Sequence, residues 1–387
     1  MKICDSVKYV GILDTDIDLF EGQYRVPDGI TYNSYVIFDE KIAVMDTADA
    51  RFGGEWLKNL KAALEGRSPD YLVVHHMEPD HSASINLFAK EYPDAKIVSS
   101  AKAFAMMKNF YGSDFADRRV VASDGTVLEL GKRTLTFYTA PMVHWPEVIV
   151  SYLSEDKILF SADGFGRFGR PETAEWADEA RRYYIGIVGK YGAQVQALLK
   201  KAAGLDIKMI CPLHGPVLRE NLGYYIDLYD KWSGYNPEKD GVLIAYASVY
   251  GNTAAAAKAL AEELRANGYN YKLLDLTRCD MKEAVGEAFA YSKLVLASMT
   301  YNAGVFPCMR EFINELCERG YNARTVGFIE NGSWAPMAAR VMRGAMEGLK
   351  NITFLENGVK INSALTEANY NEIKALAAEI VGYPILT

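Results

Sequence analysis

Short apolar runs separated by turn residues dominate the first half of the chain. The runs at 35–38 and 42–45 are predicted to be paired strands, and residues 56–64 carry apolar side chains at helical spacing. A long amphipathic helix is expected from the Pro171–Thr173 region through Leu199. Further strands are expected at 72–74, 96–98, 127–138, 148–152 and 158–160.

The pattern changes after the polar, turn-forming stretch Ser233–Asp240, which is predicted to be a linker. Apolar strand-like runs then alternate with helical segments, and this alternation predicts a parallel sheet with helices on both faces. A chain of 387 residues is also long for a single core. We therefore expect two α/β domains, residues 1–236 and 237–387. The strand-like runs of the second are 242–247, 273–276, 294–297, 326–329 and 352–355.

Composition narrows the function classes. The formal net charge of -8 argues against a nucleic-acid or anionic-membrane surface, which needs clustered Lys and Arg. No run approaches the roughly 20 apolar residues of a membrane span, and the first residues lack the apolar core of a signal peptide. The five cysteines are scattered and no C-x-x-C pair occurs, which suits reduced thiols in the cytoplasm. We expect a cytoplasmic protein with no nucleic-acid or membrane partner.

Four of the five histidines, together with three acids, fit a metal site. One group of them follows the strand at 72–74 directly, and the others each stand at the loop end of a later predicted strand. Nitrogen and carboxylate ligands in this mixture suit a pair of iron ions. The expected division is His76, Glu78 and His144 on one ion, Asp80, His81 and His214 on the other, and Asp163 between them.

Two points stay open at this stage. The same residues could be separate polar groups, each satisfied by its own surroundings. His75 precedes His76 on a strand, so its side chain should point the opposite way, and a structural or supporting role is expected for it.

Three loops of the second half have the composition of a mononucleotide site. The first joins a strand to an Ala-rich helix, whose N-terminal N–H groups suit a phosphate without any lysine. The other two follow later strands, at the edge where a doubly wound sheet binds its ligand. The expected contacts are Ser248, Val249, Tyr250, Gly251, Asn252 and Thr253, then Thr300, Tyr301, Asn302, Ala303 and Gly304, then Asn331, Gly332, Ser333 and Trp334.

These motifs carry a family resemblance. The run H-x-E-x-D-H, completed by His144, Asp163 and His214, resembles the diiron site of the flavodiiron proteins; zinc hydrolases of the same metallo-β-lactamase fold have histidine in place of Glu78. The S-x-x-G-N-T loop resembles the FMN phosphate loop of flavodoxins. The resemblance covers essentially the whole chain. It implies a metallo-β-lactamase-like αββα sandwich followed by a flavodoxin-like doubly wound parallel sheet, with FMN and two iron ions.

The resemblance also implies an activity. FMN would accept electrons from a separate donor, such as rubredoxin or another reductase, and the diiron centre would reduce dioxygen to water or nitric oxide to nitrous oxide. Members of the family pair head to tail as homodimers, alone or as a dimer of dimers. Two alternatives remain: a zinc-dependent hydrolase, and a flavodoxin-type electron carrier with a structural metal domain.

Overall fold

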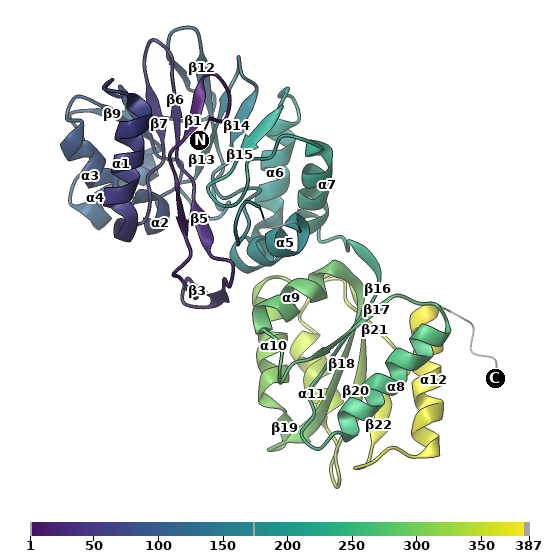
Figure 1. Cartoon of the computed structure of the whole chain (residues 1–387). Coiled ribbons are helices and arrows are strands. Elements are labelled where there is room, and N and C mark those ends of the chain that lie inside the picture. The colour runs from purple at the N-terminus through teal and green to yellow at the C-terminus, as the bar shows by residue number, and fades with distance from the viewer. Residues whose placement is uncertain (1, 173–174, 383–387) are drawn as a thin grey trace. The chain divides into compact units, whose positions relative to one another are not determined.

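The computed structural model describes residues 2–172 and 175–382. The chain forms two compact α/β units, Met1–Asp230 and Lys231–Thr387 (Figure 1). This division falls inside helix α7 (Leu222–Ser233), whereas the domain boundary expected at 236/237 stays a prediction. None of the helices in the described parts of the chain is long and apolar enough to cross a membrane.

Two packed sheets form the first unit. Their strand orders are β1-β6-β7-β8-β9-β10 and β11-β12-β13-β14-β15. Apolar side chains from both sheets, such as Val73 and Phe137, meet in one buried core between them. The first sheet contains β1 (Val7–Tyr9), β6 (Tyr35–Ile37), β7 (Ala43–Met45), β8 (Tyr71–Val73), β9 (Lys96–Ser99) and β10 (Arg119–Val121). The second contains β11 (Val127–Glu129), β12 (Thr134–Thr139), β13 (Ile149–Leu153), β14 (Ile158–Phe160) and β15 (Met209–Cys211).

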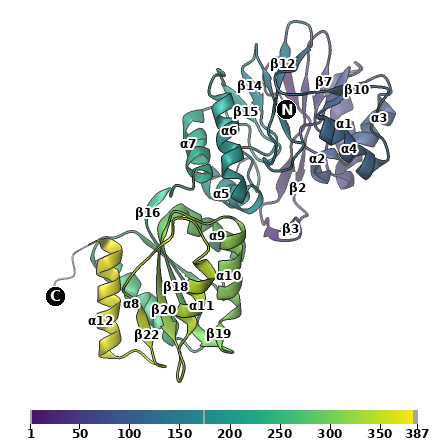
Figure 2. The ribbon, with the colours of Figure 1, turned by 180° about the vertical axis from the view of Figure 1, so that it is seen from behind.

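Both faces of the first sheet are buried, and the side-chain alternation of its strands explains how. In β8, Tyr71 and Val73 join the core between the sheets, while Leu72 joins a second core with Trp56 and Phe104 from the helices. Helices α1, α3 and α4 thus cover the outer face of this sheet, and α6 and α7 lie beside the other sheet (Figure 2). These layers are the expected αββα sandwich. The covering helices are α1 (Gly53–Leu64), α3 (Ile85–Glu91), α4 (Ala101–Tyr111) and α6 (Gly192–Ala202).

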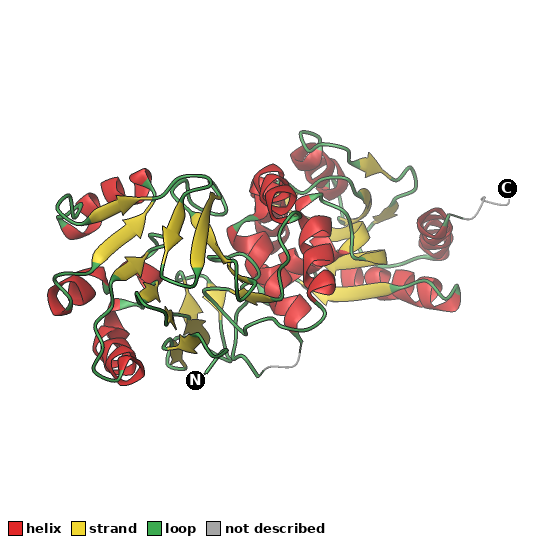
Figure 3. Ribbon diagram, turned by 90° about the horizontal axis from the view of Figure 1, so that it is seen from above, coloured by secondary structure: helices red, strands yellow, loops and turns green. Residues whose placement is uncertain are grey.

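Short elements complete this unit, and in Figure 3 its strands, in yellow, lie between helices, in red. Two small pairs of strands lie between β1 and β6 in the sequence, and two short helices lie at the strand ends. They are β2 (Ile12–Asp14) with β5 (Ile30–Tyr32), β3 (Leu19–Phe20) with β4 (Tyr24–Arg25), η1 (Ala50–Phe52) and α2 (Pro79–Ser82).

The single long helix expected up to Leu199 is wrong. The structure has α5 (Trp176–Ile187), a short 3-10 turn η2 (Gly189–Tyr191) and then α6. Gly189 has φ +35°, outside the helical range, and a residue without a Cβ adopts this conformation at little steric cost. The expected helix start at Thr173 lies outside the described residues.

A five-position parallel sheet forms the second unit. Its order is β17-β16-β18-β20, with β21 and β22 both pairing with β20, which is the 2-1-3-4-5 order of flavodoxin-like folds. The first strand begins at Lys239, inside the stretch expected to be a linker. The strands are β16 (Lys239–Tyr246), β17 (Tyr271–Asp275), β18 (Tyr291–Tyr301), β20 (Thr325–Asn331), β21 (Thr353–Phe354) and β22 (Val359–Ile361), and the short β19 (Gly304–Val305) pairs with β18.

Helices cover both faces of this sheet, as the alternation predicts. Side chains such as Leu260 of α8 and Leu376 of α12 form one core with Val295 of the central strand. The helices α9, α10 and α11 lie on the other side of the sheet (Figure 1), and α10 carries the buried Phe312. The helices are α8 (Asn252–Ala266), α9 (Met281–Ala290), α10 (Pro307–Glu318), α11 (Ala338–Met346) and α12 (Glu367–Val381).

Candidate functional site

The seven residues expected to bind metal gather at the loop ends of the sandwich strands. His76 and Glu78 follow β8, and Pro79 opens the short helix α2, which carries Asp80 and His81. The other three come from the β12–β13 connection and from the loops that follow β14 and β15; they are His144, Asp163 and His214.

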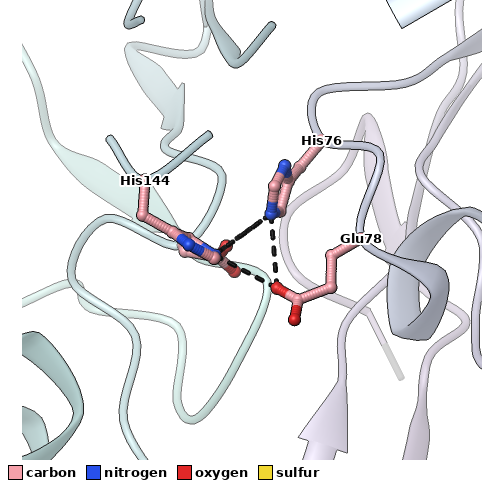
Figure 4. A group of neighbouring side chains, drawn as sticks. His76, Glu78 and His144 are labelled. Atoms are coloured by element: carbon pink, nitrogen blue, oxygen red, sulfur yellow. Dashed lines mark hydrogen bonds and ion pairs between the residues drawn. The ribbon is translucent and has the colours of Figure 1, made fainter. Parts of the chain in front are cut away.

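One group of ligand atoms contains His76, Glu78 and His144 (Figure 4). The Nε2 atoms of the two histidines lie 3.1 Å apart, and Glu78 Oε2 lies 3.4 Å from His76 Nε2 and 3.1 Å from His144 Nε2. Bonds of about 2.1 Å to one ion place neighbouring ligand atoms about 3.0 Å apart at right angles and about 3.4 Å apart in a tetrahedron. The spacing of these three atoms therefore matches the shell of a single metal ion.

The second group contains Asp80, His81 and His214. The two histidine Nε2 atoms are 3.1 Å apart, and Asp80 Oδ2 lies 3.2 Å from His81 Nε2 and 3.3 Å from His214 Nε2. These distances repeat those of the first group, so the structure offers two similar metal shells.

Asp163 joins the two groups. Its Oδ2 lies 3.3 Å from His76 Nε2 and 3.2 Å from His144 Nε2, and its Oδ1 lies 3.4 Å from His81 Nε2. One carboxylate thus presents one oxygen to each group, which is the arrangement expected of a bridging ligand. The grouping agrees with the division expected from the sequence, and ligation itself stays a prediction.

Buried carboxylate oxygens show that cations fit here. Among the described residues, neither oxygen of Asp80 or of Asp163 has a hydrogen-bond partner, although Asp163 is only 1% exposed. A buried carboxylate without hydrogen bonds is costly, and two divalent cations would compensate its charge. The donor set of imidazole and carboxylate suits iron.

Hydrogen bonds at the Nδ1 atoms of His214 and His76 set the tautomers of these two histidines. His214 Nδ1 lies 2.6 Å from the carbonyl oxygen of Thr31, which can only accept, so Nδ1 carries the proton and the neutral ring keeps its Nε2 lone pair for a metal. His76 Nδ1 donates in the same way to Glu147 Oε1, 2.8 Å away. The sequence reasoning missed Glu147; an acid three residues after a proposed ligand histidine was the available signal.

His75 points away from the metal groups. Its Nδ1 lies 2.5 Å from Asp46 Oδ2, and its Nε2 lies 2.8 Å from Ser151 Oγ on the opposite sheet. All three side chains are buried. The contact therefore ties the two sheets together beside the metal loop, which is a structural arrangement.

Without metal, protons balance the charges of the site. Burial alone would lower the pKa of His144, but the neighbouring carboxylates of Asp163 and Glu78 raise it to about 9. His76 is shifted in the same direction against its burial, mainly by the charge of Asp163. The pKa values of Glu78 and Asp163 fall below their usual range, because their histidine partners outweigh burial. Metal ions must therefore displace protons from the histidines.

The expected flavin loops surround a cavity of about 540 Å³ in the second unit. This volume is typical of a small-molecule site. Gly251 and Gly304 are not part of its lining, although they belong to the same loops. The expected residues that line it are Ser248, Val249, Tyr250, Asn252, Thr253, Thr300, Tyr301, Asn302, Ala303, Asn331, Gly332, Ser333 and Trp334, and sequence reasoning missed Met299, Ala335, Met337 and Ser363.

One end of this cavity suits a phosphate. Helix α8 begins there after Gly251, which has φ +90°, and no side chain caps its first N–H groups. Ser248 Oγ accepts a hydrogen bond from the Gly251 N–H at 3.2 Å, which closes the turn and leaves the helix end open. Uncapped N–H groups and the helix dipole attract an anion.

Exposed aromatic side chains on the wall of the cavity suit a flat aromatic ring. Tyr250 is 93% and Trp334 92% exposed, although large aromatic side chains normally bury most of their surface. At the neighbouring turn, the non-glycine residues Asn302 and Ala303 have φ of +48° and +56°, which is a strained conformation often found at ligand sites. An isoalloxazine placed against these aromatic side chains would cover their apolar surface.

Two of the expected flavin contacts already have partners within the protein. Asn331 exchanges hydrogen bonds with the backbone of Ser363, at 3.0 and 3.1 Å. Thr300 Oγ1 accepts from the Met337 N–H at 2.8 Å. These bonds hold the loops around the cavity in place, so both residues shape the site as well as line it.

Comparisons with known proteins agree with this geometry. Residues 30–215 match the family model described as ODP family beta lactamase, and residues 244–373 match the model described as Flavodoxin. The chain is 31% identical to a nitric oxide reductase from Moorella thermoacetica, over 92% of each chain.

Solved structures extend the likeness to the whole fold. The rubredoxin oxygen:oxidoreductase of Desulfovibrio gigas is 27% identical, with a TM-score of 0.91 over 99% of this chain and 98% of that one. The flavodiiron protein of Giardia intestinalis is 29% identical, with a TM-score of 0.89 over 99% of this chain and 97% of that one. The expected fold class is confirmed, and the chain belongs to the flavodiiron proteins, a family of oxidoreductases that carry FMN and two iron ions.

Proposed function

We propose that this protein reduces dioxygen to water or nitric oxide to nitrous oxide, with electrons from a separate donor protein. The observation that carries the proposal is the pair of ligand groups joined by Asp163, with Glu78 in a position where a zinc hydrolase has histidine. Relatives are named for both reactions, so both gases are candidate substrates.

The residues form two sites, one for the metal ions and one for the flavin. FMN and a pair of iron ions, when bound, would supply the electron-transfer chemistry for reduction of the gas. His76, Glu78 and His144 hold one ion, Asp80, His81 and His214 the other, and Asp163 spans both. Glu147 and the Thr31 carbonyl keep His76 and His214 in the tautomer that leaves Nε2 free. The cavity loops of the second unit, which carry Tyr250, Tyr301 and Trp334, hold the flavin.

The alternatives are less well supported. A zinc hydrolase does not account for the flavin cavity, and an electron carrier does not need two converging groups of histidines and carboxylates. Rubredoxin is a candidate donor because one relative is named for it. We also propose a cytoplasmic location, which the five free cysteines support.

The first prediction tests the reaction itself. Reduced wild-type enzyme should consume dioxygen or nitric oxide in parallel anaerobic assays and contain about two irons and one FMN per chain. Asp163→Asn, of nearly the same shape, should abolish consumption while FMN stays bound, because the shared carboxylate is lost. Asp206→Ala, an exposed acid of the same unit, is the control and should keep activity. An inactive wild-type enzyme with full iron and FMN would refute the proposal.

The second prediction concerns metal removal and pH. Protonated His144 stabilises the metal-free fold fully below its ordinary pKa of 6.5, and this contribution is lost as the pH rises through about 9. Glu78 and Asp163 affect stability at low pH. Their lowered pKa values stabilise the fold above pH 4.5 and pH 3.8, respectively, and this stabilisation is lost as the pH falls through the pKa values of the folded protein. The melting temperature of chelated protein should therefore decrease between pH 6.5 and 9.

Iron-loaded protein is the comparison for this experiment. Its melting temperature should change little over the same range, because iron replaces the protons. Iron binding there should also release protons, measured by calorimetry in buffers of different ionisation enthalpy. Equal pH profiles with and without iron would contradict the charge balance described here.

The third prediction concerns the flavin. Trp334→Ala should weaken FMN binding by about 0.5–1.5 kcal/mol, which is roughly two- to tenfold in Kd, because the ring loses a stacking partner. Titration of flavin-free protein, followed by FMN fluorescence, measures the change. Tyr370→Ala removes an exposed aromatic of the same unit that does not line the cavity, and it should leave Kd unchanged. Equal Kd values for the two variants would count against stacking on Trp334.

The fourth prediction tests the head-to-tail homodimer, which we propose brings the FMN of one subunit to the irons of the other. Asp163→Asn removes one site, and Gly251→Val disturbs the flavin loop, because valine is strained at φ +90°. Each variant alone should be inactive. A heterodimer of the two, isolated with two affinity tags, should recover activity through its one intact pair. An inactive heterodimer would rule out transfer between subunits.

A further inference from the structure

The first unit contains a second cavity, of about 220 Å³, which neither the metal groups nor the flavin loops explain. It lies between the outer face of the five-stranded sheet and the helices α6 and α7. Val150 and Leu159 line it from the sheet, and Val195, Leu198 and Ile226 line it from the two helices. The neighbours of Val150 and Leu159 along their strands face the core between the sheets, so this apolar surface is the other side of the same sheet.

Besides Tyr138, three polar side chains line this cavity, and all three are bonded within the protein. Ser161 Oγ donates to the Gly164 carbonyl at 2.6 Å, and Lys201 Nζ donates to Asp124 Oδ1 at 2.7 Å. Tyr229 Oη accepts from the Phe165 N–H at 2.6 Å. These groups offer little to water or to a polar ligand. Apolar cavities of about 150 Å³ take up xenon or benzene, and the size and apolar lining of this cavity suit a small apolar gas in the same way.

A single layer of backbone separates this cavity from the metal groups. Gly164 and Phe165 line the cavity, whereas the preceding side chain, Asp163, joins the two metal groups. Val143 lines the cavity in the same way, and the next side chain, His144, belongs to the first metal group. Phe165 has φ +66°, a strained conformation for a residue with a side chain.

We propose that this cavity holds the apolar diatomic substrate beside the metal centre, and that the gas passes between Phe165 and Val143 to reach it. The identity of the gas rests on the proposed function, while the apolar lining and the position of the cavity do not. A charged or polar ligand would lose its hydration without gaining bonds from the walls. Dioxygen and nitric oxide are small and apolar, so they partition into such a space from water.

Xenon tests whether the cavity takes up an apolar gas. Crystals of the holoenzyme pressurised with xenon should show a xenon atom between the five-stranded sheet and α6. Absence of xenon from this space would overturn the proposal. Elongated density from a resident long-chain molecule, or side chains of a neighbouring subunit filling the cavity, would overturn it as well.

Cavity-filling variants test whether the gas held there is the substrate. Val195→Phe, and separately Ala202→Phe, should displace xenon and raise KM for the gas severalfold, with kcat at saturating gas, iron content and FMN content unchanged. Ala193→Phe, on the exposed side of the same helix, is the matched control and should behave as wild type.

The two proposals fail in different ways. An unchanged KM in variants that have lost xenon would refute the role of the cavity and leave the reductase function intact. A wild-type enzyme that consumes neither gas would refute the proposed function and with it the identity of the substrate.

Discussion

The burial of negative charge at the strand ends of the sandwich is the constraint on which the rest of the first unit depends. Asp80 and Asp163 are withdrawn from water without hydrogen-bond partners among the described residues, and Glu78 lies between two histidines. Such a cluster is stable only when cations or protons compensate it. The loops after β8, β14 and β15 therefore do more than connect strands. Their conformations are stable because positive charge, from cations or protons, compensates the carboxylates that they bury.

The second unit also places its ligand site at the ends of strands, but the site has a different chemistry. The groups available to a ligand there are backbone N–H groups and aromatic faces instead of carboxylates. A doubly wound sheet places such loops next to each other because every strand runs in the same direction. Each unit thus collects residues that are distant in sequence by aligning strand ends, and each uses a donor set suited to its own cofactor.

Much of this arrangement could be predicted from the sequence, because strand-like runs followed directly by histidines, acids or small polar residues identify loop ends. The two-domain α/β fold and the grouping around Asp163 follow from that pattern. The position of Glu147 three residues after His144 is visible in the sequence, but its partner could not be predicted, since only the fold brings it to His76. The break between α5 and α6 was missed because the apolar spacing continues through it, while Gly189 changes the backbone direction. Likewise, Ser363 was missed because it follows a different strand and meets the cavity loop through hydrogen bonds to Asn331 and Ser333.

The exposed aromatic rings at the flavin cavity have a consequence for the life of the chain before it binds its cofactor. Tyr250 and Trp334 leave nearly all of their surface open to water, and they line the same cavity as the half-exposed Tyr301. A newly synthesised chain without flavin therefore exposes aromatic surface of the kind that chaperones and neighbouring chains bind. Bound flavin would cover these rings, so only the flavin-loaded protein would lack the exposed aromatic surface that chaperones bind.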